Sequence, residues 1–390
     1  MFSSRLPGRL TPNALGEAVA HAKRTNRVLL DLTETNPTKV GLSYPPDIRS
    51  SLADPAGALY EPDPRGMRAA RQVVAAEYAR AAVRVDPDHI VLAPSTSDAY
   101  GWLFKLLCDP GDAVLVPQPS YPLFELLTGL EGVQAQGYRL EYSGAWWIDR
   151  ESLEHAIGPR TRAVLVVAPN NPTGSCVRAE DHDWLVALSA ARGIAIIADE
   201  VFAEYPLALR EDARRMAGER DALVFALGGL SKSAGLPHLK LAWIAASGPD
   251  DLVAAALDRL DVIADTYLSV STPVQVALPT LVAAGRRVRA SITERIARNL
   301  AHVRSALAAH PAVTLLEPEG GWSAVLRVPA IESEDDLVLR ILRDDDVVVH
   351  PGYFFDFAEE AYLVVSLLPD QPVFDVALDR VLRAVDKGPA

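Results

Sequence analysis

The sequence predicts an α/β fold in which a large domain, with a mostly parallel sheet sandwiched by helices, is joined to a smaller α+β domain. Short, nearly continuous apolar runs alternate with helical stretches through the middle of the chain, at residues 89–93, 113–116, 163–168, 194–198, 223–227 and 241–245. Strands that are buried on both faces and separated by helices are typical of parallel sheets. The chain of 390 residues is also long enough for two packed units.

The remaining elements divide the chain. Residues 286–310 have charge on one side and Val, Ile and Leu on the other, which predicts a long amphipathic helix that bridges two domains. Shorter elements are expected on either side of the sheet region: a helix capped by Thr11 with Pro12 in its first turn, a helix at 67–82, and strands at 313–316, 324–328, 347–349 and 362–368. We therefore place the large domain at 46–288 and the small domain at 1–45 and 289–390.

Composition excludes several classes of partner. A formal net charge of −13 disfavours nucleic acid, because phosphate binding needs a basic surface. The sequence shows no signal-peptide core and no apolar stretch that could span a membrane, so we expect a cytoplasmic protein without a membrane partner. The chain has two cysteines, which fits a reducing compartment, and none of its eight histidines stands at metal-ligand spacing, so no metal is expected.

Polar and reactive side chains follow the carboxyl ends of the predicted strands, which is where open parallel sheets bind ligands. After the first run come Ser95, Thr96 and Ser97 at the start of a helix, where free backbone N–H groups favour an anion. Other runs are followed by an aromatic side chain, an amide, an acid and a lysine, at Tyr121, Asn171, Asp199 and Ser231-Lys232. We expect these groups to meet at one edge of the sheet.

This set of side chains is the one that pyridoxal 5′-phosphate requires. Lys232 would hold the cofactor as a Schiff base and then move the proton at the substrate α-carbon. Asp199 would keep the pyridine nitrogen protonated, Asn171 would hydrogen-bond the 3′-oxygen, and Tyr121 would stack on the ring. The turn at 95–97 would bind the phosphate, and Ser231 belongs to the same cofactor-binding set. The predicted catalytic residues are Lys232, Asp199 and Tyr121.

Each of these residues has an ordinary structural explanation when it is taken alone. A lysine after a strand is usually solvated, an aspartate at a strand end usually caps a helix, and Asn-Pro-Thr-Gly forms a good turn. Their occurrence together, in order and at successive strand ends, is what favours the cofactor. A nicotinamide dinucleotide is disfavoured, because no G-x-G-x-x-G motif follows an early strand.

With these motifs the chain resembles the class I/II aminotransferases, which are fold-type I pyridoxal phosphate enzymes. The matching motifs, in the family's order, are YEPDPRG at 60–66, STSDA at 95–99, CDPGD at 108–112, PSYP at 119–122, NNPTG at 170–174, ADEVF at 198–202, LSK at 230–232 and HPGYFF at 350–355. The resemblance covers essentially the whole chain and implies transamination between an amino acid and a 2-oxo acid. It also implies a homodimer with active sites at the subunit boundary, where Tyr60 reaches the phosphate of the neighbouring subunit's cofactor.

Three departures from the family pattern concern the cofactor. Lys240 stands where the family usually has a phosphate-binding arginine, so a point charge replaces a bidentate fork. Gly229 replaces a serine or threonine, which removes one hydroxyl from the phosphate site. Phe202 replaces the tyrosine that bonds the 3′-oxygen, which leaves Asn171 as the side-chain donor there and favours protonation of the imine.

A fourth departure concerns the substrate. Val364 stands where the family has the arginine that clamps the substrate α-carboxylate. Another cation such as Lys39 or Arg65, backbone donors, or a substrate other than an ordinary α-amino acid would each account for it. Gly320-Gly321-Trp322 resembles a pocket wall near the substrate, but a tryptophan in such a strand more often belongs to the core, so it stays outside the predicted set.

Two other activities remain open at this point. The missing arginine makes a different pyridoxal phosphate chemistry more plausible, such as β-elimination, racemisation or oxidation. A cofactor-binding regulator without catalysis is disfavoured, because the chain has neither an attached DNA-binding segment nor the charge for one.

Overall fold

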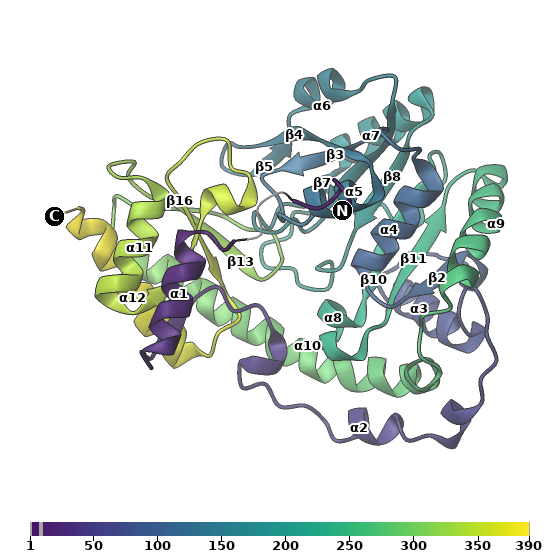
Figure 1. The fold of residues 1–390 in the computed structure, drawn as a ribbon, viewed down its shortest axis with the longest axis horizontal. Coiled ribbons are helices and arrows are strands. Elements are labelled where there is room, and N and C mark those ends of the chain that lie inside the picture. Colours follow the sequence, from purple (N-terminus) through teal and green to yellow (C-terminus); the bar gives the residue numbers. More distant parts are fainter. Residues whose placement is uncertain (1, 8–10, 390) are drawn as a thin grey trace.

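The larger of the two main sheets forms the centre of one lobe in the computed structural model, which describes residues 2–7 and 11–389 (Figure 1). Its eight strands lie in the order β2-β11-β10-β8-β6-β3-β4-β5. Their bounds are β2 Ile90–Ala93, β3 Ala113–Gln118, β4 Gln134–Tyr142, β5 Trp146–Ile148, β6 Thr161–Val167, β8 Ala195–Asp199, β10 Val224–Gly229 and β11 Ala242–Ser247. All six expected apolar runs are therefore strands of this sheet.

Most neighbouring strands of the larger sheet run parallel, as expected. β4, β3, β6, β8 and β10 pair in parallel, whereas β11 is antiparallel to β10 and β2, and β5 is antiparallel to β4. β11 reverses because the chain returns from β10 through one short helix and a 3-10 turn, which is too little for a crossover.

Helices pack on both faces of the larger sheet. They are α3 Arg68–Arg80, α4 Thr96–Leu107, α5 Phe124–Glu131, α6 Arg150–Ala156, α7 Ala179–Arg192, α8 Leu230–Ser233 and α9 Asp250–Tyr267. Apart from these there are the short helix α2 Asp47–Ser51 and the two-stranded pair of β7 Val177–Arg178 with β9 Ala213–Arg214. Because helices cover both faces, β2 and β8 are buried along their whole length.

The second sheet is antiparallel and lies in the other lobe. Its strands are β12 Thr314–Leu316, β13 Ser323–Arg327, β16 Tyr362–Ser366 and β15 His350–Pro351, in that order. The helices of this lobe are α1 Ala14–Arg24, α11 Glu334–Asp345 and α12 Gln371–Lys387, and β1 Leu30–Asp31 pairs with β14 Val347–Val348. Leu326 and Leu363 belong to the core cluster on one face, and Val325 and Val364 pack with Trp146 of the larger sheet on the other.

One helix, α10, joins the two lobes and runs along the lower edge of the molecule in Figure 1. It spans Thr272–Leu307 and has 36 residues, so it begins 14 residues before the expected start at 286. The expectation missed this first part because residues 272–285 carry no charge until position 286, and a helix that is apolar on most sides lacks the amphipathic signal. The domain boundary at 288 stays a proposal.

The N-terminal helix begins later than expected. Asn13, and not Thr11, caps α1, because the Asn13 side chain accepts a hydrogen bond from the backbone N–H of Gly16 at 2.9 Å. The N-cap preference of asparagine exceeds that of threonine, in agreement with this choice. Proline at position 12 therefore precedes the helix instead of opening it.

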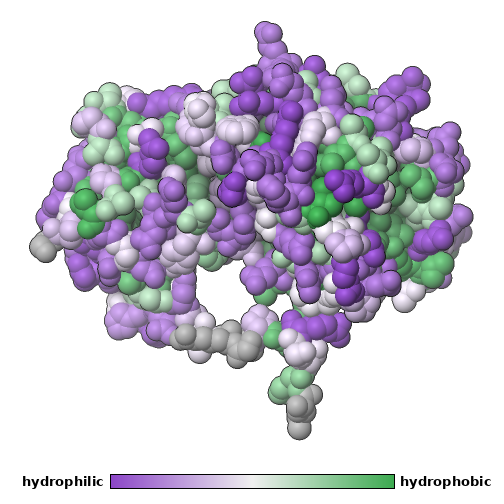
Figure 2. Space-filling view, turned by 90° about the horizontal axis from the view of Figure 1, so that it is seen from above, coloured by the Kyte–Doolittle hydropathy of each residue, from purple (hydrophilic) through white to green (hydrophobic). Residues whose placement is uncertain are grey.

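The outer surface is mainly hydrophilic on the face shown in Figure 2, where the hydrophobic residues gather in smaller patches. Within residues 2–7 and 11–389, no single helix is long and apolar enough to cross a membrane. Only α9 and α10 taken as a pair, bent by 116° between them, reach the necessary length and composition.

Candidate active site

Lys232 lies in α8, which starts directly after β10, so its amine is at the carboxyl edge of the larger sheet. Its Nζ is 4.8 Å from the ring centroid of Trp322 and 5.3 Å from that of Phe202. Burial among these groups lowers the pKa of the lysine to about 8, and the negative charge of Asp199 opposes part of this shift. A substantial fraction of the amine is therefore neutral and nucleophilic near neutral pH.

Asp199 ends β8 beside Lys232 and is 9% exposed. Burial raises the pKa of this carboxyl group, whereas hydrogen bonds and the charge of Lys232 lower it. The hydroxyl of Tyr100 donates to Oδ2 at 2.8 Å, and the backbone N–H of Val201 donates to Oδ1 at 3.1 Å. Both oxygens thus have a donor, and together with the nearby cation these donors favour the carboxylate over the acid.

The loop after β6 carries Asn171, which is half-buried. The hydroxyl of Ser323 donates to Asn171 Oδ1 at 3.3 Å, so this loop is in direct contact with the smaller sheet. Its neighbour Asn170 is buried and donates to the carbonyl of Pro119 at 2.9 Å, while Ser120 donates to Asn170 Oδ1 at 2.8 Å. Asn170 therefore ties the loop that carries Tyr121 to the loop that carries Asn171.

The turn expected to bind phosphate forms the N-terminus of α4. Ser95 caps the helix and accepts the backbone N–H of Asp98 at 3.1 Å, and its hydroxyl donates to the Asp98 carboxylate. Thr96 and Ser97 occupy the first turn and are half-buried. The first-turn N–H groups of a helix have no partner inside the helix, so they are suited to a phosphate.

The other predicted residues differ in exposure. Tyr121 is 45% exposed and Tyr60 is 68% exposed. Ser231 is half-buried beside Lys232, and Lys240 is exposed at a left-handed backbone position with φ +50°. The chain thus brings Lys232 and Asp199 close enough to interact, and it leaves Tyr60 on the surface of this single chain.

Two of the family departures have a steric or packing reason. A Cβ atom at position 229 would lie 3.1 Å from the Cβ of Ala242 on the antiparallel strand β11, so the backbone there leaves little room for a serine. The ring of Phe202 meets that of Trp322 edge-on, with centroids 5.3 Å apart. Phe202 therefore packs in the aromatic wall around Lys232. This packing does not require the hydroxyl group of the tyrosine that the family has here.

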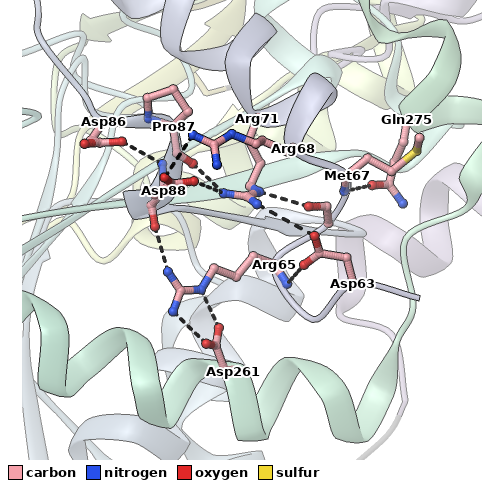
Figure 3. Close-up of polar contacts among 11 residues, drawn as sticks. Asp63, Arg65, Met67, Arg68, Arg71, Asp86, Pro87, Asp88, Asp261 and Gln275 are labelled. Atoms are coloured by element: carbon pink, nitrogen blue, oxygen red, sulfur yellow. Dashed lines mark hydrogen bonds and ion pairs between the residues drawn. The ribbon is translucent and has the colours of Figure 1, made fainter. Parts of the chain in front are cut away.

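Arg65 does not act as a free cation for a substrate. Its guanidinium is held by both carboxylate oxygens of Asp261, at 2.6 Å each, and donates to the carbonyl of Asp88 at 2.8 Å (Figure 3). Arg71 in the same network bonds the carbonyl of Gly66 at 2.9 Å. These contacts fix the loop after Tyr60 to α9 and to the turn before β2, and they engage the guanidinium that the sequence suggested as a clamp for the carboxylate.

The structure adds three residues that sequence reasoning left out. Tyr100 bonds Asp199 from inside α4, the hydroxyl of Tyr205 donates to the backbone carbonyl of Lys232 at 2.5 Å, and Trp322 packs against the Lys232 amine. Tyr100 and Tyr205 are buried and resemble core residues in sequence. One feature of the sequence could have indicated Tyr100: it lies four residues after the predicted site residue Thr96 and therefore on the same helix face.

Comparison with known proteins identifies the family. Residues 38–381 match the model described as "Aminotransferase class I and II". The chain belongs to the class I and II aminotransferases. It is 26% identical over 366 residues to the alanine aminotransferase of Mycobacterium tuberculosis, which covers 90% of this chain and 84% of that relative. It is 25% identical to the glutamate-pyruvate aminotransferase of Escherichia coli, with 94% of each protein covered.

Solved structures share the fold of this aminotransferase. An alanine aminotransferase from Pyrococcus furiosus superimposes with a TM-score of 0.88 at 22% identity over 100% of both chains. An aspartate aminotransferase from Thermus thermophilus gives 0.85 at 21% identity, with 98% of this chain and 99% of the other covered. Aminotransferases of this class depend on pyridoxal phosphate.

The residues present fit that cofactor. A lysine with a lowered pKa stands beside an aspartate that accepts two hydrogen bonds, and a helix N-terminus with three hydroxyl side chains follows a neighbouring strand. These supply an amine for the aldehyde, a carboxylate for the pyridine nitrogen and donors for the phosphate. Among the described residues, no group of three or more His, Cys, Asp or Glu side chains could hold a metal ion.

We expect the apoenzyme to bind pyridoxal phosphate covalently at a rate that rises with pH and levels off above about 8. Only the neutral amine reacts with the aldehyde, so each pH unit below the pKa lowers the rate about tenfold. The measurement is stopped-flow absorbance of the cofactor at evenly spaced pH values between about 6 and 10. Because Asp199 raises the pKa of Lys232, Asp199→Asn should move the midpoint to lower pH. A midpoint at the ordinary lysine value of 10.5 would contradict this assignment.

Proposed function

We propose that Lys232 carries pyridoxal phosphate as a Schiff base and moves the proton at the substrate α-carbon in a transamination between an amino acid and a 2-oxo acid. The observation that carries the proposal is the pair formed by half-buried Lys232 and buried Asp199. The lysine has a pKa near 8, and the aspartate is held by Tyr100 and Val201. When bound, the cofactor supplies an electron sink for the α-carbon. A base with a pKa close to the working pH is suited to proton transfer.

The other residues of the proposed site bind the cofactor and enclose it. The Asp199 carboxylate orients the cofactor ring by charge, and Asn171 Nδ2 is the side-chain donor for the ring oxygen. Tyr121 covers one ring face and excludes water. The phosphate is bound by the set that comprises Ser95, Thr96, Ser97, Ser231 and Lys240.

We also propose that the enzyme is a cytoplasmic homodimer in which Tyr60 of each chain completes the neighbouring site. The exposure of Tyr60, at 68%, leaves the phenol free for such a contact. Tyr60 and Thr272 line the same small cavity beside Trp102, so the loop before α10 belongs to the same surface. A dimer in which only one of the two chains lacks Tyr60 would lose activity at one site only.

The relatives suggest where to look for the substrates. They act, by their names, as alanine, glutamate-pyruvate and tyrosine aminotransferases. We propose that alanine or glutamate is the amino donor and that pyruvate or 2-oxoglutarate is the acceptor. At identities of 23–26% the choice between them rests on the test below.

We expect an effective amino donor to shift the absorbance of the bound cofactor without release of ammonia, and a 2-oxo acid to reverse the shift. The reason is that each half-reaction converts the cofactor between its aldehyde and amine forms. A panel of alanine, glutamate, aspartate and tyrosine, each followed by pyruvate or 2-oxoglutarate, measures both directions.

β-Elimination is the second candidate, because Val364 replaces the carboxylate arginine. Release of pyruvate and ammonia from a serine or cysteine donor, without any acceptor, would favour it. If no donor in the panel changes the absorbance, transamination of these amino acids is excluded.

A further inference from the structure

We propose that the indole N–H of Trp322 is a substrate-binding donor that holds the carboxylate of the amino acid and the 2-oxo acid. The proposal deepens the proposed transaminase function and rests on it. It assigns to a neutral donor the contact for which the family pattern has an arginine and this chain has Val364.

The first observation is an unused donor. Trp322 is 2% exposed, and its Nε1 has no hydrogen-bond partner among the residues that the structure describes. A buried indole N–H normally finds a partner, and leaving it unpaired destabilises the fold. In a side chain that packs against Lys232, such an unpaired donor is available to an acceptor on a bound ligand.

The second observation is the position of the ring. The centroid of Trp322 lies 4.8 Å from Lys232 Nζ. The substrate nitrogen must come to the same place as this amine, because the two groups exchange in the reaction. In an α-amino acid the carboxyl carbon is about 2.5 Å from the amine nitrogen. The carboxylate of such a substrate then lies close to the Trp322 ring.

The third observation is the rigid support of the ring. Phe202 and Tyr205 both meet Trp322 edge-on, with centroids 5.3 and 5.1 Å away. Before it, Gly320 packs so closely that a Cβ atom there would lie 2.7 Å from Cγ of Pro169. The donor is therefore held in one orientation, which preserves its affinity for an acceptor.

The fourth observation is the apolar packing of Val364. Val364 is 2% exposed and packs with Val325, Phe355 and Trp146. Its partner on the neighbouring strand is His350, whose pKa burial lowers to about 4 while Asp31 opposes part of the shift. This histidine is neutral at ordinary pH, and the charge that faces it is negative.

The two cations suggested by the sequence offer little. Arg65 is bound to Asp261, and Lys39 is exposed at the end of a 3-10 turn. A neutral N–H binds a carboxylate less strongly than an arginine fork. The enzyme should therefore tolerate substrates whose carboxylate is replaced by a neutral hydrogen-bond acceptor, such as an amide.

The test is Trp322→Phe, which keeps an aromatic ring in place and removes the N–H. We expect the KM for alanine and pyruvate, or for the best pair from the panel, to rise about tenfold or more, with a smaller change in kcat. Calorimetric titration of the holoenzyme with propionate, a carboxylate without an amine, should show the same loss of affinity. The reaction of the holoenzyme with propylamine, which has no carboxylate, should keep its rate constant.

The control is Trp146→Phe. Trp146 also has a buried indole N–H without a partner among the described residues, but it packs beside Val364 and not against Lys232. Its substitution should leave the propionate affinity unchanged. Replacing Trp322 with its benzothiophene analogue, which has sulfur in place of N–H, is a second variant with nearly the native shape in case the phenylalanine leaves a destabilising cavity.

Three results would overturn the proposal: an unchanged propionate affinity in both Trp322 variants, no propionate binding by the wild type, or a loss of affinity in Trp146→Phe or Lys39→Gln instead. These results differ from a failure of the proposed function. In that case the wild-type protein would not bind the cofactor covalently or would not respond to any amino donor.

Discussion

Lys232→Ala is expected to lower the rate of transamination by at least about 10²–10⁴-fold, the contribution of a positioned acid–base group. Alanine removes both the amine that holds the cofactor and the base that moves the α-proton, so the loss should lie at the upper end of this range or beyond it. Steady-state kcat with the best donor pair is the measurement. Mass spectrometry after borohydride reduction should also show the cofactor on residue 232 of the wild type.

The matched control for this variant is Lys23→Ala. Lys23 is an exposed lysine on α1, in the lobe of the smaller sheet. It should retain wild-type kcat and the reducible label on Lys232. Label found on another lysine, or substantial turnover by the alanine variant, would remove Lys232 from the mechanism.

Asp199→Asn is expected to lower kcat by about 10²–10³-fold while covalent cofactor binding through Lys232 is retained. An amide has nearly the same shape as the carboxylate but no charge, so it no longer favours the protonated pyridine nitrogen. The pH at which the cofactor absorbance changes should shift in the same variant. Kinetics and a spectrophotometric pH titration of the holoenzyme therefore measure two consequences of one charge.

Tyr100→Phe separates the charge of Asp199 from its hydrogen bond. This variant keeps the carboxylate and loses only the donor at 2.8 Å, so we expect a fall of about tenfold. An equal loss in Asp199→Asn and Tyr100→Phe would mean that orientation, and not charge, is what Asp199 contributes.

Most strands of the larger sheet could be predicted, because strands that are buried on both faces have continuous apolar sequences. β4 was not predicted, since it lies near the edge of the sheet and all its residues except buried Tyr138 are partly or fully exposed. The direction of β11 was also beyond prediction, because its run resembles those of the parallel strands and only its connection sets the orientation. The start of α1 was misplaced because two capping residues lie close together, and the start of α10 because its first part is uncharged and lacks an amphipathic pattern.

The candidate site could be predicted in part, for a topological reason. Asp199 ends a strand, Asn171 and Lys232 each come shortly after one, and the larger sheet brings these strand ends together. Tyr100 and Trp322 could not be assigned, because a buried aromatic residue has the same pattern whether it fills space or faces a ligand. A role can be assigned to their hydroxyl and indole groups only when the neighbouring atoms are known. The roles of all these residues remain predictions until the variants are measured.

The continuity of α10 has a consequence for how the sequence can evolve. Adding or removing one residue of a helix turns everything beyond it by about 100° and moves it by about 1.5 Å. Between Gly285, packed against Ala234 at the end of α8, and Asn299, bonded to the carbonyl of Leu367, such a change would swing β13 and Trp322 away from Lys232. Length variation among functional descendants should therefore be confined to surface loops, and this segment should keep a constant number of residues.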